Sequence, residues 1–363
     1  KCWHYDSGWL ITMFTSAVRG KRSLVWIFFA FFAALTPAGS FAADSAVIVM
    51  YHRFGESRYP STNTTVGQFA AHLQELKDGN YVVKPVPEIL AAIRSGTELP
   101  DKTVGITIDD AFLSVYKIGW PMLRKAGLPF TLFVATDPLD RKTSGYMSWD
   151  QLRELHKAGV TISSQTATHL HMPHATDKQN SVNLEASNAR FKAELGFKPK
   201  IIAYPYGEYS LAVGEVSRAA GFEVGFGQHS GVIYKGSDFF YLPRFAFNEA
   251  FGDIKRFRLA VRALPFKVSD LTPEDPYLKN KQNPPPFGFT VDGGAVKRLS
   301  RIACYASRQG KVNVERLGEY RIEVRAPKAF PPGRTRINCT LLEKNGRWRW
   351  LGMQYLVPKP QRD

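Results

Sequence analysis

Short apolar segments alternate with amphipathic segments along residues 46–227, and this alternation restricts the possible folds more than any other feature. Short apolar segments predict strands at residues 47–51, 104–108, 130–135, 160–164, 200–204 and 222–227. Between them, apolar residues at helical spacing predict helices around residues 69–76, 89–93, 148–158, 184–195 and 211–220. Repeated strand–helix alternation indicates a parallel sheet with crossover helices, either a barrel or an open doubly wound sheet.

Polar side chains follow the carboxyl ends of these predicted strands. They are His52, Asp109 and Asp110, Gln165 and His169, Tyr206, and His229. In both architectures the active site forms where the strands end and their following loops begin. We therefore expect these residues to share one functional edge.

Two of these residues, Asp109 and Asp110, are adjacent carboxylates, which repel each other unless something neutralises them. A divalent cation held by one carboxylate is one solution, and a solvated loop is the alternative for the pair taken alone. The histidine-rich stretch 164–174 favours the cation, because imidazole and carboxylate are common ligands of zinc and its neighbours. An open coordination position on such a metal could activate water.

Three ordered motifs carry a resemblance to a known family. Residues 107–110 (TIDD), 164–169 (SQTATH) and 203–207 (AYPYG) look like motifs of the polysaccharide deacetylases, which remove N- or O-linked acetyl groups from glycans. The flanking segments 50–52, 149–152 and 221–222 resemble that family too. The likeness covers roughly residues 46–250 and implies an α/β fold, a distorted (β/α) barrel with fewer than eight full units.

The resemblance implies roles for the central residues. Asp109 would be the general base, Asp110 and His169 would bind a divalent metal such as zinc, and the backbone N–H of Tyr206 would stabilise the oxyanion. Gln165 stands where the family usually has its first metal histidine, and an amide oxygen is a poor zinc ligand. His174, His171 or His52 could take its place.

Further residues follow from the same resemblance. Arg244 is expected in the catalytic group, where it supports the base or the pocket wall. His229 is the stand-in for a late general-acid histidine, because the usual Leu-x-His pattern is absent. His52, Trp149 and Pro205 are expected to contact the substrate.

The first 42 residues have the layout of a secretory signal. A basic patch precedes the apolar run 24–35, and small residues two apart, Ser40 and Ala42, offer a cleavage site. An uncleaved anchor or a buried core helix is the alternative, although the run is short for a membrane span. We therefore expect an exported protein, periplasmic or secreted, without a stable transmembrane anchor.

The remaining chain divides into a deacetylase-like domain (43–268), a Pro-rich linker (269–286) and a small β domain (287–363). Cys304 and Cys339 are expected to form a disulfide in that β domain. Residues 43–363 carry 44 basic against 31 acidic residues, a formal charge of +13, and residues 287–363 hold +10 of it. Such charge favours acidic partners, while export argues against nucleic acid.

Three functions are compatible with these features. The first is metal-dependent removal of acetyl groups from an extracytoplasmic polysaccharide, including an anionic one. The second is a catalytically silent glycan-binding protein on the same scaffold, which Gln165 favours and the retained Asp109–Asp110 pair disfavours. The third is hydrolysis of another ester or amide at the same edge. The sequence leaves the glycan, the metal and the oligomeric state open.

Overall fold

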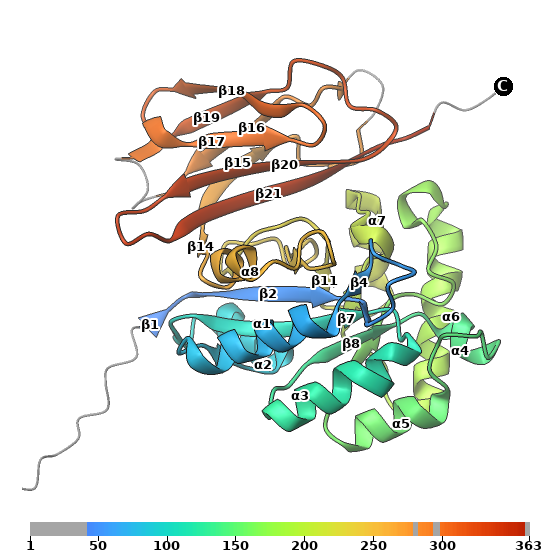
Figure 1. Cartoon of the computed structure of the whole chain (residues 1–363). Helices are drawn as coiled ribbons and strands as arrows, with labels where there is room; N and C mark the ends of the chain where they lie inside the picture. Colours follow the sequence, from blue (N-terminus) through green and yellow to red (C-terminus); the bar gives the residue numbers. More distant parts are fainter. Residues whose placement is uncertain (1–41, 279–281, 293–297, 360–363) are drawn as a thin grey trace, which may run out of the picture. The chain divides into compact units, whose positions relative to one another are not determined.

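The computed structural model describes residues 42–278, 282–292 and 298–359. These residues form one compact unit (Figure 1). The predicted signal segment, apart from Ala42, lies outside the described residues. None of the helices in the described ranges is both long and apolar enough to cross a membrane.

A nine-stranded sheet forms the centre of the α/β domain. Its main path runs in the order β11-β10-β9-β8-β7-β2-β12, with β5 added on β7 and β13 on β2. All neighbours from β11 to β2 pair in parallel, as the alternating pattern predicts, and only β12 is antiparallel. The strands are β2 (Ser45–Tyr51), β5 (Val82–Val83), β7 (Thr103–Asp109), β8 (Thr131–Val134), β9 (Thr161–Ser164), β10 (Ile201–Ala203), β11 (Val224–Phe226), β12 (Ile233–Tyr234) and β13 (Phe245–Ala246).

Helices pack around this sheet, and several of them begin at polar caps. The helix that the sequence predicts from Ser148 starts there through a capping box, in which Gln151 N donates to Ser148 Oγ and Ser148 N to Gln151 Oε1. The helices are α1 (Val66–Asp78), α2 (Val86–Ser95), α3 (Trp120–Ala126), α4 (Thr136–Asp140), α5 (Trp149–Lys157), α6 (Asp177–Leu195), α7 (Leu211–Ala219) and α8 (Ile254–Val261), with short turns η1 (Val115–Gly119), η2 (Met172–His174) and η3 (Pro205–Gly207).

The sheet is curled, and its central strands are buried on both faces. Strand β2 is apolar almost throughout, and every residue of β7 is buried. This near-continuous burial is typical of parallel strands covered by helices. The expected distorted (β/α) barrel is therefore confirmed.

The C-terminal part of the chain forms a second, eight-stranded sheet in the order β14-β21-β20-β17-β18-β19-β16-β15. We call this the β module. The sheet includes β15, which covers the first four residues of the predicted linker, and β14 within the predicted deacetylase-like domain. Its strands are β14 (Leu264–Pro265), β15 (Val268–Thr272), β16 (Phe287–Val291), β17 (Ala303–Ala306), β18 (Gly310–Leu317), β19 (Arg321–Arg325), β20 (Gly333–Leu342) and β21 (Trp348–Val357). Short pairs β1 (Ala42–Ala43) with β6 (Leu99–Pro100) and β3 (Arg53–Phe54) with β4 (Asn63–Thr64) complete the fold.

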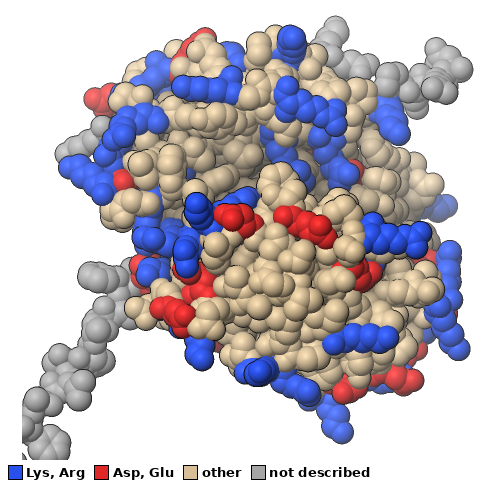
Figure 2. Space-filling model, in the orientation of Figure 1, with Lys and Arg blue, Asp and Glu red and all other residues tan. Residues whose placement is uncertain are grey.

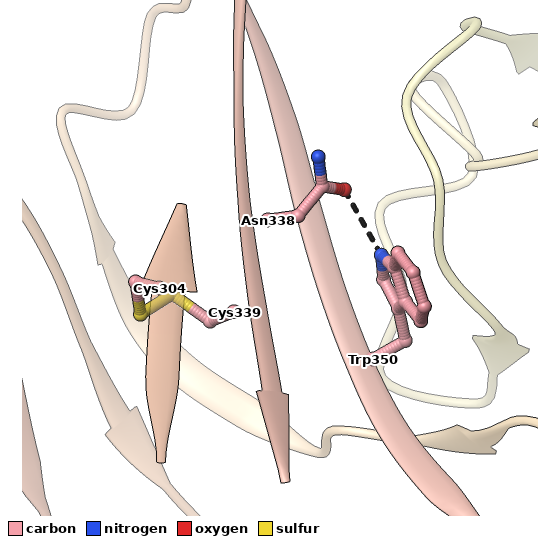
Figure 3. Close-up of a disulfide and its surroundings, with 4 residues drawn as sticks. All are labelled: Cys304, Asn338, Cys339 and Trp350. Atoms are coloured by element: carbon pink, nitrogen blue, oxygen red, sulfur yellow. Dashed lines mark hydrogen bonds between the residues drawn. A yellow bond between two sulfur atoms is a disulfide. The ribbon is translucent and has the colours of Figure 1, made fainter. Parts of the chain in front are cut away.

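The expected disulfide is confirmed, and it joins neighbouring strands of the β module. Cys304 on β17 pairs directly with Cys339 on β20, and both residues are fully buried (Figure 3). Beside it, Trp350 on β21 donates from Nε1 to Asn338 Oδ1 at 2.9 Å (Figure 3). Lys and Arg side chains spread over the face of the module that Figure 2 shows, in keeping with its positive charge.

Candidate active site

The predicted site residues gather at the carboxyl edge of the parallel sheet. Asp109 is the last residue of β7, His52 directly follows β2, and Gln165 directly follows β9. Tyr206 lies in the turn that follows β10, two residues beyond Tyr204. The parallel register therefore brings residues more than a hundred positions apart to one edge, as the strand pattern predicts.

Asp109 is fully buried and held by a fully buried arginine. Arg244 donates from Nη1 to Asp109 Oδ1 at 2.6 Å and from Nη2 to Asp109 Oδ2 at 2.9 Å. Its remaining donors reach Thr107 Oγ1 and the Gly227 carbonyl. Two parallel bonds fix the plane of the carboxylate and pair its charge with a cation in the interior. Asp109 is thereby held in one orientation at the edge of the sheet.

Asp110 faces the other way, toward His169. Asp110 Oδ1 lies 3.3 Å from His169 Nε2, and both side chains remain slightly exposed, at 16% and 22%. Burial acts to raise the pKa of Asp110, but the hydrogen bond and charge of His169, with His52 and Arg53 nearby, outweigh it and lower that pKa below its ordinary value. The carboxylate is therefore anionic and available as a ligand at neutral pH.

Gln165 is fully buried beside Asp110, and its amide oxygen already accepts a hydrogen bond. Its Oε1 accepts from the backbone N–H of Asp110 at 3.1 Å. Its Nε2 is buried and has no hydrogen-bond partner among the described residues. A buried amide N–H₂ without an acceptor costs on the order of 1–3 kcal/mol, so this position is imperfectly satisfied as it stands.

The donor set fits a divalent cation through two side chains. Two ligands of one tetrahedral zinc lie about 3.3 Å apart, which is the separation of Asp110 Oδ1 and His169 Nε2. Among the described residues there is no cluster of three or more His, Cys, Asp or Glu arranged to hold a metal ion. By the family resemblance Gln165 stands where a metal histidine is usual, and Asp110 and His169 are the pair at ligand spacing that the structure brings together.

Tyr206 has an unusual backbone. Its φ is 60° and the next residue, Gly207, has φ 66°, so two consecutive residues are left-handed. A Cβ on Gly207 would lie 2.5 Å from the backbone nitrogen of Gln228, so only glycine fits. The ring of Tyr206 stacks on that of His171 at 4.1 Å and meets the edge of His169 at 4.6 Å.

Left-handed backbone is concentrated at this edge of the sheet. Asp110, Thr166, His169 and Tyr206 have φ between 57° and 69°. A non-glycine residue in this region costs on the order of 1–2 kcal/mol and persists only where its surroundings impose it. Four such residues, including the Asp110–His169 pair itself, indicate that surrounding contacts hold these groups in conformations that lower the stability of the fold.

His52, expected to contact the substrate, and His229, expected as the general acid, occupy different environments. His52 is 14% exposed, and its Nε2 lies 4.0 Å from Asp109 Oδ2. His229 is buried against Tyr241, and its Nδ1 has no partner among the described residues. Burial, with Arg336 and Arg244 nearby, lowers the pKa of His229 to about 3. His229 is therefore neutral at working pH, whereas His52 faces the reacting edge.

Three other predicted residues lie around the centre rather than in it. Trp149 begins α5, donates from Nε1 to Asp140 and packs edge-on against Phe191. Pro205 opens the turn that contains Tyr206. His174 lines an open groove and lies beyond His171, at 6.0 Å between ring centroids.

Three residues that the sequence reasoning did not single out also contact the site. Glu208 is 4% exposed and lies 2.7 Å from His171 Nδ1, while Gln354 and Arg334 of the β module reach the carbonyl groups of the Tyr206 turn. Glu208 follows the 203–207 motif directly and could have been found there. Gln354 and Arg334 come more than 120 positions later, in strands without any motif.

Comparisons with known proteins show what this chain is similar to. The sequence model of the polysaccharide deacetylase family matches residues 96–225. The chain is 26% identical over 230 residues to a poly-beta-1,6-N-acetyl-D-glucosamine N-deacetylase of Staphylococcus aureus (strain MRSA252), covering 55% of this chain and 78% of that protein.

Solved structures agree on the fold. The structure of IcaB from Ammonifex degensii superposes with a TM-score of 0.55 and 26% identity, covering 61% of this chain and 98% of that one. The deacetylase PplD of Streptococcus pyogenes has a TM-score of 0.55 at 21% identity and covers 60% and 98%. The family match spans the paired aspartates, the histidine stretch and the Tyr206 turn, so the resemblance to the polysaccharide deacetylase family is confirmed over residues 96–225.

Proposed function

We propose that this protein hydrolyses N- or O-linked acetyl groups on an extracytoplasmic polysaccharide and depends on a divalent metal ion. The observation that carries the proposal is the convergence of three groups at one edge of the sheet. These are the Asp109–Arg244 pair, the Asp110–His169 pair and the left-handed turn at Tyr206. Together they supply a base, a candidate metal site and an oxyanion donor.

The residues of this chain take the following roles. Asp109, held by Arg244, accepts the proton of the attacking water. Asp110 and His169 hold the metal, which when bound polarises the acetyl carbonyl and makes water more acidic. The N–H of Tyr206 stabilises the oxyanion, and His52 is placed to protonate the leaving group, a role for which His229 is too strongly held neutral.

The surroundings support a polymeric substrate. An open groove of about 730 Å³ runs beside the site. Its lining includes polar and ionisable side chains from several elements: Asp137, Thr168, His171, His174, Lys178 and Asn183. The relative from S. aureus is named for poly-β-1,6-N-acetyl-D-glucosamine, so that polymer is the first substrate to test. The disulfide Cys304–Cys339 supports an oxidising compartment outside the cytoplasm.

The test measures metal content and acetate release together. Residues 43–363, purified without chelator or added histidines, are analysed by mass spectrometry for bound metal and assayed for acetate release from the polymer. We expect bound metal and turnover, and loss of both in Asp110→Asn. Acetate release that persists unchanged in metal-free protein would contradict metal dependence.

A second function remains a candidate because of Gln165. By the family resemblance it replaces a metal histidine, so the site could be too weak to retain metal, and the chain would then bind glycan without cleaving it. Saturable binding of the polymer by protein that carries no metal even after soaking with zinc, cobalt or nickel would favour this second function.

A further inference from the structure

The turn that carries Tyr206 is contacted by the β module as well as by the α/β domain. Gln354 on β21 is 2% exposed, and its Nε2 donates to the Tyr206 carbonyl at 3.1 Å and to the Gly207 carbonyl at 2.8 Å. One buried amide therefore binds two successive carbonyl groups. Gln354 is itself anchored, because the buried hydroxyl of Tyr241 donates to its backbone carbonyl at 3.0 Å.

Arg334 contacts the same turn from the neighbouring strand, β20. Its Nη1 donates to the Tyr206 carbonyl at 3.3 Å, and its guanidinium lies 5.2 Å from the centre of the Tyr206 ring. Its Nε lies 3.7 Å from Glu208 Oε1, and Glu208 in turn contacts His171, whose ring stacks on Tyr206. The tyrosine is thus held between an imidazole from the α/β domain and a guanidinium from the β module.

These contacts act where the backbone is least stable on its own. Two consecutive left-handed residues, one of them a tyrosine, revert to ordinary backbone unless neighbouring groups impose the conformation. Gln354 satisfies both carbonyls only when the two peptide planes point toward β21. The direction of the Tyr206 N–H is fixed with the rest of the turn, and oxyanion donors lose their effect when displaced by about 1 Å.

We propose that the β module is an intramolecular brace that sets the conformation of the Tyr206–Gly207 turn, with Gln354 and Arg334 as positioning residues. This inference rests on the proposed function for its catalytic consequence, since Tyr206 is there the oxyanion donor. The β module therefore forms part of the deacetylase site, although neither residue touches the reacting atoms.

The experiment compares variants of residues 43–363. Gln354→Leu keeps the approximate volume and removes both bonds, Arg334→Met removes the charge, and Arg334→Lys restores a donor. Arg316→Met on β18 is the matched control, because Arg316 is exposed and bonds only to the Glu319 carbonyl among the described contacts. Two quantities are measured: kcat and KM for acetate release, and amide hydrogen exchange of the peptide that covers residues 204–210.

We expect faster exchange at residues 204–210 in Gln354→Leu, with kcat reduced roughly 10- to 100-fold and KM little changed. Arg334→Met should show the same pattern more weakly, Arg334→Lys should recover part of it, and Arg316→Met should match the wild type. If Gln354→Leu proves poorly folded, the Arg334 series decides the matter, because that side chain is 41% exposed.

Unchanged amide hydrogen exchange at residues 204–210 in both Gln354→Leu and Arg334→Met would contradict the proposed role of the β module as a brace. Faster exchange with an unchanged kcat would also overturn it as a catalytic device. If the wild type releases no acetate, the proposed function fails, and the exchange measurement alone still decides whether the module braces the turn.

Discussion

The two halves of the candidate site differ in how completely they are built. The base half has a buried carboxylate with both oxygens bonded to Arg244, which is itself fully buried. The metal half has a carboxylate and an imidazole at ligand spacing, but its third position holds an amide whose N–H₂ lacks a partner among the described residues. In the proposed function, the fold therefore positions the base half completely, whereas metal retention would depend on two protein ligands.

The largest effect is expected in the base half. Asp109→Asn should lower acetate release roughly 1,000-fold, because an amide cannot accept the proton of water. Bound metal should stay unchanged, while the thermal unfolding midpoint should fall in a protein that still folds, because Arg244 is left buried without its carboxylate partner. Loss of folding at ordinary temperature would show instead that Asp109 is chiefly structural.

Arg244→Met tests how strongly the pair is coupled. The variant leaves a buried carboxylate without its cation, so the free energy of unfolding should fall by about 3–5 kcal/mol. Urea denaturation measures this loss. The double variant Asp109→Asn with Arg244→Met should recover part of it, and additive losses would contradict a coupled pair.

Gln165→His tests the incomplete half directly. A second imidazole, as a third ligand beside Asp110 and His169, should raise zinc affinity at least about tenfold, or about 1.4 kcal/mol, by isothermal titration calorimetry. His174→Ala is the matched control and should leave affinity unchanged, since His174 lies beyond His171. A weaker affinity in Gln165→His would mean that the amide itself is a ligand.

The smallest effect is expected at His229. Its pKa of about 3 lies below the ordinary value of about 6.5, so it gains a proton only as pH falls through about 3. The stability that the neutral ring contributes is thus fully present above about pH 6.5 and is lost on acidification toward pH 3. His229→Gln should leave the pH–rate profile between pH 5 and 9 unmoved, whereas His52→Gln should lower kcat because it removes the proposed proton donor.

The sequence predicts the α/β architecture and the edge of the site because both depend on local patterns. Apolar alternation places β7 and β9, and their ends carry Asp109 and Gln165 to the same edge. The left-handed backbone of Asp110 and Tyr206 leaves no such trace, because these residue types adopt ordinary backbone elsewhere. Contacts from the β module are likewise set by tertiary packing alone.

The predicted linker also differs from the structure in its first residues. The predicted linker contains Pro and charged residues, yet Val268–Thr272 pairs as β15 with β16, because the edge of the module's sheet offers partners that composition does not reveal. The predicted domain boundaries, between residues 268 and 269 and between residues 286 and 287, stay predictions. Roles for Trp149, Pro205 and His174 also stay predictions that substrate complexes would test.

The bond between Asp109 and Arg244 joins residues 135 positions apart. During folding, the interior cannot close over Asp109 until the segment that carries Arg244 has arrived, because an ionised carboxylate without a partner is too costly to bury. The proposed general base therefore reaches its folded environment only in a nearly complete domain. In the exported protein that we propose, a chain transported before folding would assemble this centre only at its destination.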